Sequence, residues 1–193
     1  LLLRLKIVLK GKSDFSIDQL PKRIARVFDE VILHKKVASG KRKSAGILHA
    51  LVMYGFIFFG LITINHFGMA FGLPIFSDSI RHIYFLFFGA PWAILCSIGI
   101  LGLAYRRFVI KPEALGKFSS TSAIVSVFIV TLMVTYLIDE FHILSGTAEK
   151  FNWWLHSGVI GGFLFLIPQS KHMHLVLSPF NIFLRPFEAV SYT

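Results

Sequence analysis

The sequence predicts an all-α integral membrane protein, and three observations support this fold class. Of its 193 residues, 55% are hydrophobic and only 16% are charged, far from the composition of a soluble domain. Four long apolar segments follow one another along the chain. The basic residues gather in alternate connections between these segments, so the net charge of +10 reflects membrane topology rather than a surface for nucleic acid.

The four apolar segments are the expected membrane-spanning helices. They cover residues 45–71, 83–105, 122–137 and 153–168, and the last one runs on towards residue 174. The third and fourth segments are short, and the fourth spans a bilayer only if Gln169 and Ser170 lie in the interface. Eighteen of the 20 Lys and Arg residues fall on one side, which places both ends in the cytoplasm and the chain in the inner (cytoplasmic) membrane.

The chain accordingly divides into three parts. Residues 1–44 form a cytoplasmic segment, residues 45–175 a transmembrane bundle, and residues 176–193 a cytoplasmic exit. Leu1, Leu2 and Leu3 look like the end of an apolar run, so we expect a fifth helix upstream, the alternative being a short interfacial helix.

The cytoplasmic segment contains a predicted amphipathic helix between residues 14 and 43. Ile24, Val27, Phe28 and Val31 recur at helical spacing, and basic and acidic side chains occupy the other side. Such a helix either lies on anionic lipid or docks a cytoplasmic partner. The sequence leaves these two alternatives open.

The eight histidines are the strongest functional signal, because ionisable side chains inside a membrane are costly. His156 and His174 are 18 residues apart, about five turns of one helix, so both face the same way and lie ~27 Å apart. That separation nearly matches the ~30 Å hydrocarbon core of a bilayer. His49 and His66 are 17 residues apart on the first span, which turns them about 100° from each other.

Two helices then offer two imidazoles at each membrane level: His49 with His174 inside, and His66 with His156 outside. Two imidazoles at one level suit the axial ligation of one haem iron, so we expect two haem b groups. His172 is the reserve for His174, since Pro168 bends the fourth span before either residue. His82 and His142 are expected at the outer interface, where the alternatives are solvation, ligation or a quinone contact, and His34 is expected to be solvated.

Glycines on the first and fourth spans have two interpretations. They either let a flat macrocycle approach the backbone or allow close helix packing. These glycines are Gly46, Gly55, Gly60, Gly158, Gly161 and Gly162.

Three stretches of the chain carry a family resemblance. The first is WWLHSGVIGGFLFLIPQSKHMHLVLSPFNIF, with its marked positions at Trp153, Trp154, His156, Ile167, Pro168, Lys171, His174, Pro179 and Asn181. The second, KKVASGKRKSAGILHALVMYGF, contributes Gly46, His49, Gly55 and Phe56. The third, YRRFVIKPEAL, contributes Arg106, Arg107 and Pro112, and together the stretches span residues 35 to 183.

These stretches resemble the membrane cytochrome b family of the nitrate reductase gamma subunit and the heterodisulfide reductase membrane subunit. The likeness is strongest to the N-terminal membrane domain of flavoprotein-linked, menaquinone-reducing iron-sulfur proteins. The resemblance implies a five-helix, di-haem b membrane subunit that transfers electrons between a cytoplasmic iron-sulfur partner and membrane quinone. It prefers His174 to His172, because the family histidine follows a basic residue by three. His66 departs from the family pattern, which makes it the least secure ligand.

The single cysteine, Cys96, excludes an iron-sulfur cluster held by this chain's own thiolates. We therefore expect electrons to pass to or from a cluster-bearing subunit or domain on the basic cytoplasmic side. Polar residues near a haem are candidate quinone contacts, and a carboxylate among them is a candidate proton carrier. These candidates are Lys171, His172 and Asn181 inside, and Asp139, Glu140 and His142 outside.

Other classes of function remain as alternatives. One is the membrane cytochrome b of a nitrate- or sulfite-reductase-type complex. A transporter would instead show broken helices that converge at the midplane, whereas these histidines lie near the ends of their spans. A non-haem metal enzyme would need more clustered histidines, and a purely structural anchor would require none.

Overall fold

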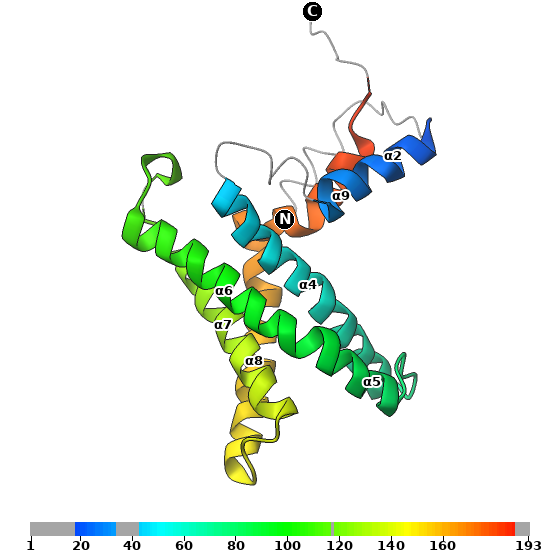
Figure 1. Cartoon of the computed structure of the whole chain (residues 1–193), viewed down its shortest axis with the longest axis vertical. Coiled ribbons are helices and arrows are strands. Elements are labelled where there is room, and N and C mark those ends of the chain that lie inside the picture. Colours follow the sequence, from blue (N-terminus) through cyan, green and yellow to red (C-terminus); the bar gives the residue numbers. More distant parts are fainter. Residues whose placement is uncertain (1–17, 34–42, 117, 188–193) are drawn as a thin grey trace, which may run out of the picture.

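The computed structural model describes residues 18–33, 43–116 and 118–187. Its long helices lie side by side (Figure 1). The first is α4 (Lys43–Ala70). The second is a continuous run of four elements: α5 (Asp78–Tyr84), η2 (Phe85–Gly89), α6 (Ala90–Tyr105) and η3 (Arg106–Ile110). The last two are α7 (Ser120–Glu140) and α8 (Thr147–Gln169). In this order each packs on the next: α4 on α6, α6 on α7, and α7 on α8. The all-α prediction is confirmed.

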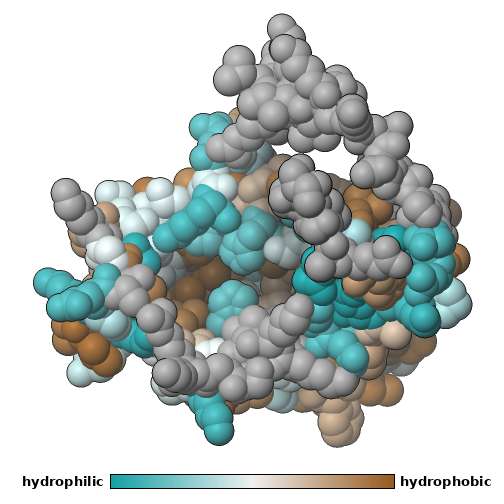
Figure 2. All heavy atoms as spheres, turned by 90° about the horizontal axis from the view of Figure 1, so that it is seen from above, coloured by the Kyte–Doolittle hydropathy of each residue, from teal (hydrophilic) through white to brown (hydrophobic). Residues whose placement is uncertain are grey.

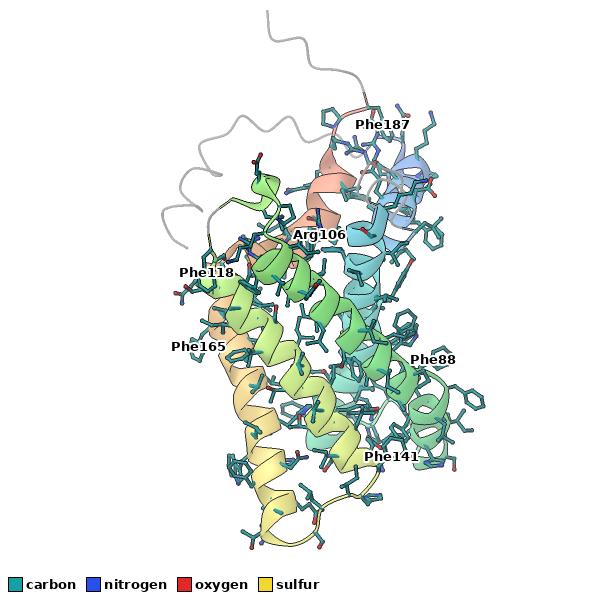
Figure 3. All side chains as sticks on the ribbon, turned by 60° about the vertical axis from the view of Figure 1, so that its left-hand side comes forward. Phe88, Arg106, Phe118, Phe141, Phe165 and Phe187 are labelled. Atoms are coloured by element: carbon teal, nitrogen blue, oxygen red, sulfur yellow. The ribbon has the colours of Figure 1, made fainter. Side chains whose placement is uncertain are left out.

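In the described part of the chain, three helices are long and apolar enough to cross a membrane. These spans are Lys43–Met69, Ser79–Ile110 and Ser120–Glu140. Apolar side chains also cover the outside of the bundle: Figure 3 shows Phe88 and Phe165 at its outer sides, 41% and 75% exposed. Outward phenylalanines are favourable in lipid and unfavourable in water. The chain is therefore a multi-pass membrane protein.

The fourth predicted span forms helix α8, which has 23 residues but is not among the three apolar spans. Its first half carries Asn152 and His156, whose polar side chains lower its hydropathy. Its crossing of the membrane stays a prediction.

The second span is longer than the sequence indicated, because helix continues from residue 78 to residue 110. It contains a π-helical turn, η2, that ends just before Pro91 in the first turn of α6. Proline has no backbone N–H and clashes with the carbonyl one turn earlier, so a local widening of the helix is the expected accommodation.

The prediction of one continuous helix through His174 is wrong. Helix α8 ends at Gln169, and Ser170 is extended, with φ −119° and ψ 172°. A short 3₁₀ turn, η5 (Lys171–Met173), follows, and a new helix, α9, begins at His174. Pro168 contributes by removing a backbone donor, and the Ser170 hydroxyl accepts from the His172 backbone N–H at 3.2 Å. His156 and His174 therefore do not share one helix face.

At one end of the bundle, which we call the capped end, α2 (Leu20–Val27) with η1 (Phe28–Ile32) lies beside α9 (His174–Leu184) (Figure 1). Arg23 of α2 is only 5% exposed, and its guanidinium donates to the Phe183 carbonyl of α9 at 2.8 Å. The Arg26 guanidinium donates to the Arg185 carbonyl at 2.6 Å. Cations satisfy the carbonyls at a helix C-terminus, so these arginines fasten α2 to α9.

The amphipathic helix predicted for residues 14–43 is thus confirmed as a helix over its described part, but only some of its apolar side chains lie in the contact. Arg23 is buried and Val27 and Val31 are half-buried, whereas Ile24 and Phe28 are 56% and 53% exposed. The Tyr54 hydroxyl on α4 donates to the Ile32 carbonyl, which ties this helix to the first span. Leu1 to Leu3 and His34 lie outside the described residues.

The opposite end, which we call the loop end, carries the connections at residues 71–77 and 141–146. Asn65 of α4 is 1% exposed, and its Oδ1 atom accepts from the backbone N–H groups of Ile75 at 3.0 Å and Phe76 at 2.8 Å. A buried side-chain acceptor thus holds the first connection against its own helix.

Candidate functional site

At the capped end the structure brings together two of the predicted ligands. His49 lies on α4 and His174 begins α9, and their ring centroids are 6.2 Å apart at an interplanar angle of 35°. The two residues are 125 positions apart in the sequence, so only the tertiary structure brings the rings together.

The protonation of the His174 ring follows from its hydrogen bond. Its Nδ1 atom lies 2.9 Å from the Lys171 backbone carbonyl. A carbonyl can only accept, so Nδ1 carries the proton, and in the neutral ring the lone pair is on Nε2. Metal-binding histidines commonly use their second nitrogen in this way, which orients the ring as a ligand.

His172 lies beside this pair, with its ring centroid 6.3 Å from that of His174. Its Nδ1 atom is 3.2 Å from the Ser170 hydroxyl, within the same 3₁₀ turn. Partial burial lowers the pKa of His172, and the charges of Lys171 and His174 lower it further. The ring is therefore biased towards the neutral form, but it is His174 whose ring approaches His49.

The separation of His49 and His174 can be tested against a shared metal. Two imidazoles bound on opposite sides of one metal ion, through bonds of ~2 Å each, have ring centroids about 6 Å apart. The observed 6.2 Å fits this requirement. Among the described residues, no group of three or more His, Cys, Asp or Glu side chains is placed to hold a metal. A haem needs only two protein ligands, because its macrocycle supplies the others.

At the loop end, His156 of α8 contacts a threonine of α7. Its Nδ1 atom lies 2.7 Å from the Thr135 hydroxyl oxygen. One turn earlier on α8, the Asn152 side-chain amide donates to the Thr135 backbone carbonyl at 2.9 Å. Both Thr135 and Asn152 are buried, 3% and 5% exposed. Two side chains of α8 thus contact a single residue of α7.

The predicted partner of His156 is exposed at the same end. His66 of α4 and Asp139 both act electrostatically on His156. Glu140 in turn interacts with Arg81, His66 and His142, among others. His66 and His156 thus lie within electrostatic reach of the same acidic residues, in a polar cluster at the loop end of which His66 is one of several exposed members.

The remaining candidate quinone contacts lie at the two opposite ends of the bundle. Lys171 lies near Arg107, whose charge adds to the effect of burial in lowering the Lys171 pKa. Asn181 is exposed on α9. At the loop end, His142 has a positive φ of 50°, and its N–H donates to the Asp139 carbonyl at 3.0 Å.

The glycines divide into two groups by the space around them. A Cβ at Gly55 would meet Cys96 at 2.8 Å, and one at Gly162 would meet Phe128 at 2.8 Å, so these two serve close helix packing. A Cβ at Gly60, Gly158 or Gly161 would meet nothing within 4 Å. Open space at these three is what a flat group near the backbone requires.

Sequence reasoning missed Thr135 and Asn152. The spacing of Asn152 and His156, four residues apart, places both on one face of a helix and would have indicated a shared contact. Thr135 gave no such signal, because its role depends on how α7 packs against α8.

Fold and site together define a class: an all-α, multi-pass membrane protein with two neighbouring histidine rings, from two helices, at one end. No family model matches the chain, and no solved structure matches it. The chain is similar to a Bacillus subtilis (strain 168) protein described as "Probable iron-sulfur-binding oxidoreductase FadF", with 29% identity over 218 aligned residues. The alignment covers 96% of this chain and 30% of that relative, so the chain spans less than a third of the relative's length. This is a distant relation to an iron-sulfur oxidoreductase.

Proposed function

We propose that the chain is the di-haem b membrane part of a quinone-linked oxidoreductase. In this function it transfers electrons between a cytoplasmic iron-sulfur partner and membrane menaquinone. The observation that carries the proposal is the approach of the His49 and His174 rings, whose centroid separation of 6.2 Å is compatible with one iron between them.

The topology of this proposal has α4, α5–α6, α7 and α8 crossing the cytoplasmic membrane. The capped end is then cytoplasmic, because it carries Arg106, Arg107 and Lys171 together with the basic helix α2 (Figure 3). Seen from this end, hydrophilic residues lie along part of the edge of a hollow in which hydrophobic residues are visible (Figure 2). An apolar recess with a polar rim is a suitable entrance for a cofactor or quinone.

Within this function His49 and His174 hold the cytoplasmic haem, and His66 and His156 hold the outer one. The haems supply reversible one-electron chemistry, and the chain sets their ligands, their positions and their apolar surroundings. Lys171, His172 and Asn181 are the proposed quinone contacts at the cytoplasmic end. Asp139, Glu140 and His142 are those at the outer end, where a carboxylate is placed to exchange protons with water.

The iron-sulfur partner is proposed from two observations. Cys96 is buried in the core against Gly55, so it is not available as a cluster ligand. The relative with which the chain aligns is described as iron-sulfur-binding and extends well beyond the matched region. A separate subunit or a further domain that docks at the capped end would supply the clusters.

Haem content tests the function directly. The protein is purified with its native partners, and haem is quantified by the pyridine haemochrome assay. We expect two b-type haems per chain, both reduced when menaquinol or the iron-sulfur partner donates electrons. A preparation with intact partners and no haem would refute the proposal.

A further inference from the structure

The Thr135 hydroxyl is shared by two partners at the same distance. Its oxygen lies 2.7 Å from the Thr131 backbone carbonyl and 2.7 Å from the Nδ1 atom of His156. The Leu132 carbonyl is also within 3.2 Å. Thr135 is 3% exposed, so no solvent has access to change this arrangement.

One hydroxyl proton decides the direction of both bonds. A backbone carbonyl can only accept, so the contact with Thr131 requires Thr135 to donate its single proton there. Towards His156 the hydroxyl oxygen must then accept. The reverse arrangement would leave two oxygens 2.7 Å apart with no proton between them. The Nδ1 atom of His156 therefore carries the proton.

Asn152 helps to hold Thr135 and His156 in the positions that this pair of hydrogen bonds requires. Its amide donates to the Thr135 backbone carbonyl at 2.9 Å, while His156, one turn later on α8, contacts the hydroxyl of the same residue. Two contacts to one residue fix both the spacing and the rotation of α8 on α7 at this level. Without Asn152, α8 would keep only the His156 contact with Thr135.

We propose that Thr135, braced by Asn152, is the positioning residue that keeps His156 protonated on Nδ1 and so keeps the Nε2 lone pair free for a metal. A hydrogen-bond acceptor behind the ring also raises the basicity of the ligating nitrogen. The consequence for haem rests on the proposed function. The tautomer itself does not, because it follows from the contacts of Thr135 alone.

The tautomer is measured first, in the full chain isolated without haem. Nitrogen-15 NMR of labelled histidines, assigned with His156→Gln, is expected to show His156 as the Nδ1–H form in the unsubstituted chain. Thr135→Val removes the acceptor with little change of shape and should raise the Nε2–H population. An Nε2–H ring in the unsubstituted chain, or an unchanged ring in Thr135→Val, would overturn the proposal.

The effect on the ligand is measured in the haem-loaded protein. Thr135→Val should weaken haem retention at one of the two sites about 10- to 100-fold, the usual cost of losing such a contact. The haem that remains there should have a raised midpoint potential, because a less basic imidazole stabilises ferric iron less. Thr135→Ser keeps the hydroxyl and should restore both properties.

Thr63→Val is the matched control. The Thr63 hydroxyl on α4 donates to the Phe59 carbonyl of its own helix at 2.9 Å, the same back-bond that Thr135 makes. Its loss should leave both potentials unchanged. Equal shifts in Thr63→Val and Thr135→Val would show a general packing effect and contradict the proposal. Absence of haem from the unsubstituted protein would instead contradict the proposed function, and the NMR result would stand.

Discussion

The two ends of the bundle orient their histidines with different parts of the chain. At the capped end the Nδ1 atom of His174 lies 2.9 Å from a backbone carbonyl, that of Lys171, within the same turn. At the loop end the Nδ1 atom of His156 lies 2.7 Å from a side-chain hydroxyl, that of Thr135 on the neighbouring helix. Both arrangements leave Nε2 as the nitrogen with the free lone pair. The contact of His174 lies within one turn of the chain, whereas the contact of His156 depends on how α7 packs on α8.

This difference has a consequence for how each site responds to change. A backbone carbonyl survives any side-chain substitution, so the His174 ring stays oriented as long as the 3₁₀ turn forms. The hydroxyl is lost by one substitution and is misplaced if α7 and α8 shift. The capped-end pair should therefore be the more robust site, and the loop-end site the one that single substitutions tune.

The largest effect is expected from removal of the ligands themselves. His174→Ala and His156→Ala should each remove one haem and leave the other, because each deletes an axial bond at one end only. The double variant should contain none. Pyridine haemochrome content relative to protein measures all three, and reduced-minus-oxidised spectra identify which haem is lost.

His172→Ala is the control at the capped end, since His172 is adjacent to the ligand pair but its ring is not the one that approaches His49. It should retain both haems. Loss of haem from His172→Ala, with retention in His174→Ala, would exchange the two assignments.

His66 is the least certain member of the two proposed histidine pairs. Its side chain is exposed, whereas that of His49 is half-buried. His66→Ala should remove the same haem as His156→Ala, and redox titration should show one remaining midpoint potential. His142→Ala, which changes another exposed histidine of the same polar cluster, should keep both haems. If His142→Ala loses the haem and His66→Ala does not, the second loop-end ligand is His142.

The fastening of the capped end is tested by Arg23→Ala. The buried guanidinium bridges α2 to the Phe183 carbonyl at 2.8 Å, and hydrogen bonds of charged groups contribute about 1.5–3 kcal/mol. Local opening of α9 should become ~2 kcal/mol easier, which corresponds to about 30-fold faster amide hydrogen exchange. Lys22→Ala, which removes an exposed contact with Gln19, should leave the exchange of α9 unchanged. Equal exchange in both variants would mean that Arg23 does not hold the cap.

The smallest expected effect concerns the open space at Gly158. Gly158→Ala should cost no stability, because a Cβ there meets nothing within 4 Å, whereas Gly55→Ala overpacks against Cys96 and should cost about 1–3 kcal/mol. Thermal unfolding in detergent measures both variants. Equal losses of stability in the two variants would contradict this difference in packing.

Sequence patterns predicted the helices well and their ends less well. The apolar segments at 45–71 and 122–137 are found within or close to α4 and α7, because hydrophobic length is a local property. The wrong prediction concerns residues 169–174. Hydropathy predicts one continuous helix there, but the chain turns at Ser170 and the helix ends at Gln169. The choice of His174 over His172 is favoured by its approach to His49, although the helix-face argument for it does not hold.

What the sequence by itself determined is the membrane class, the all-α fold and the set of histidines worth considering. These follow from composition and spacing, which do not depend on distant contacts. Only the tertiary structure decided that the rings of His49 and His174 lie near each other, that Thr135 contacts His156 and Asn152, and that a buried Arg23 fastens α2 to α9. Each of these depends on which helices become neighbours and on their relative rotation, and neither quantity is set by the pattern of a single segment.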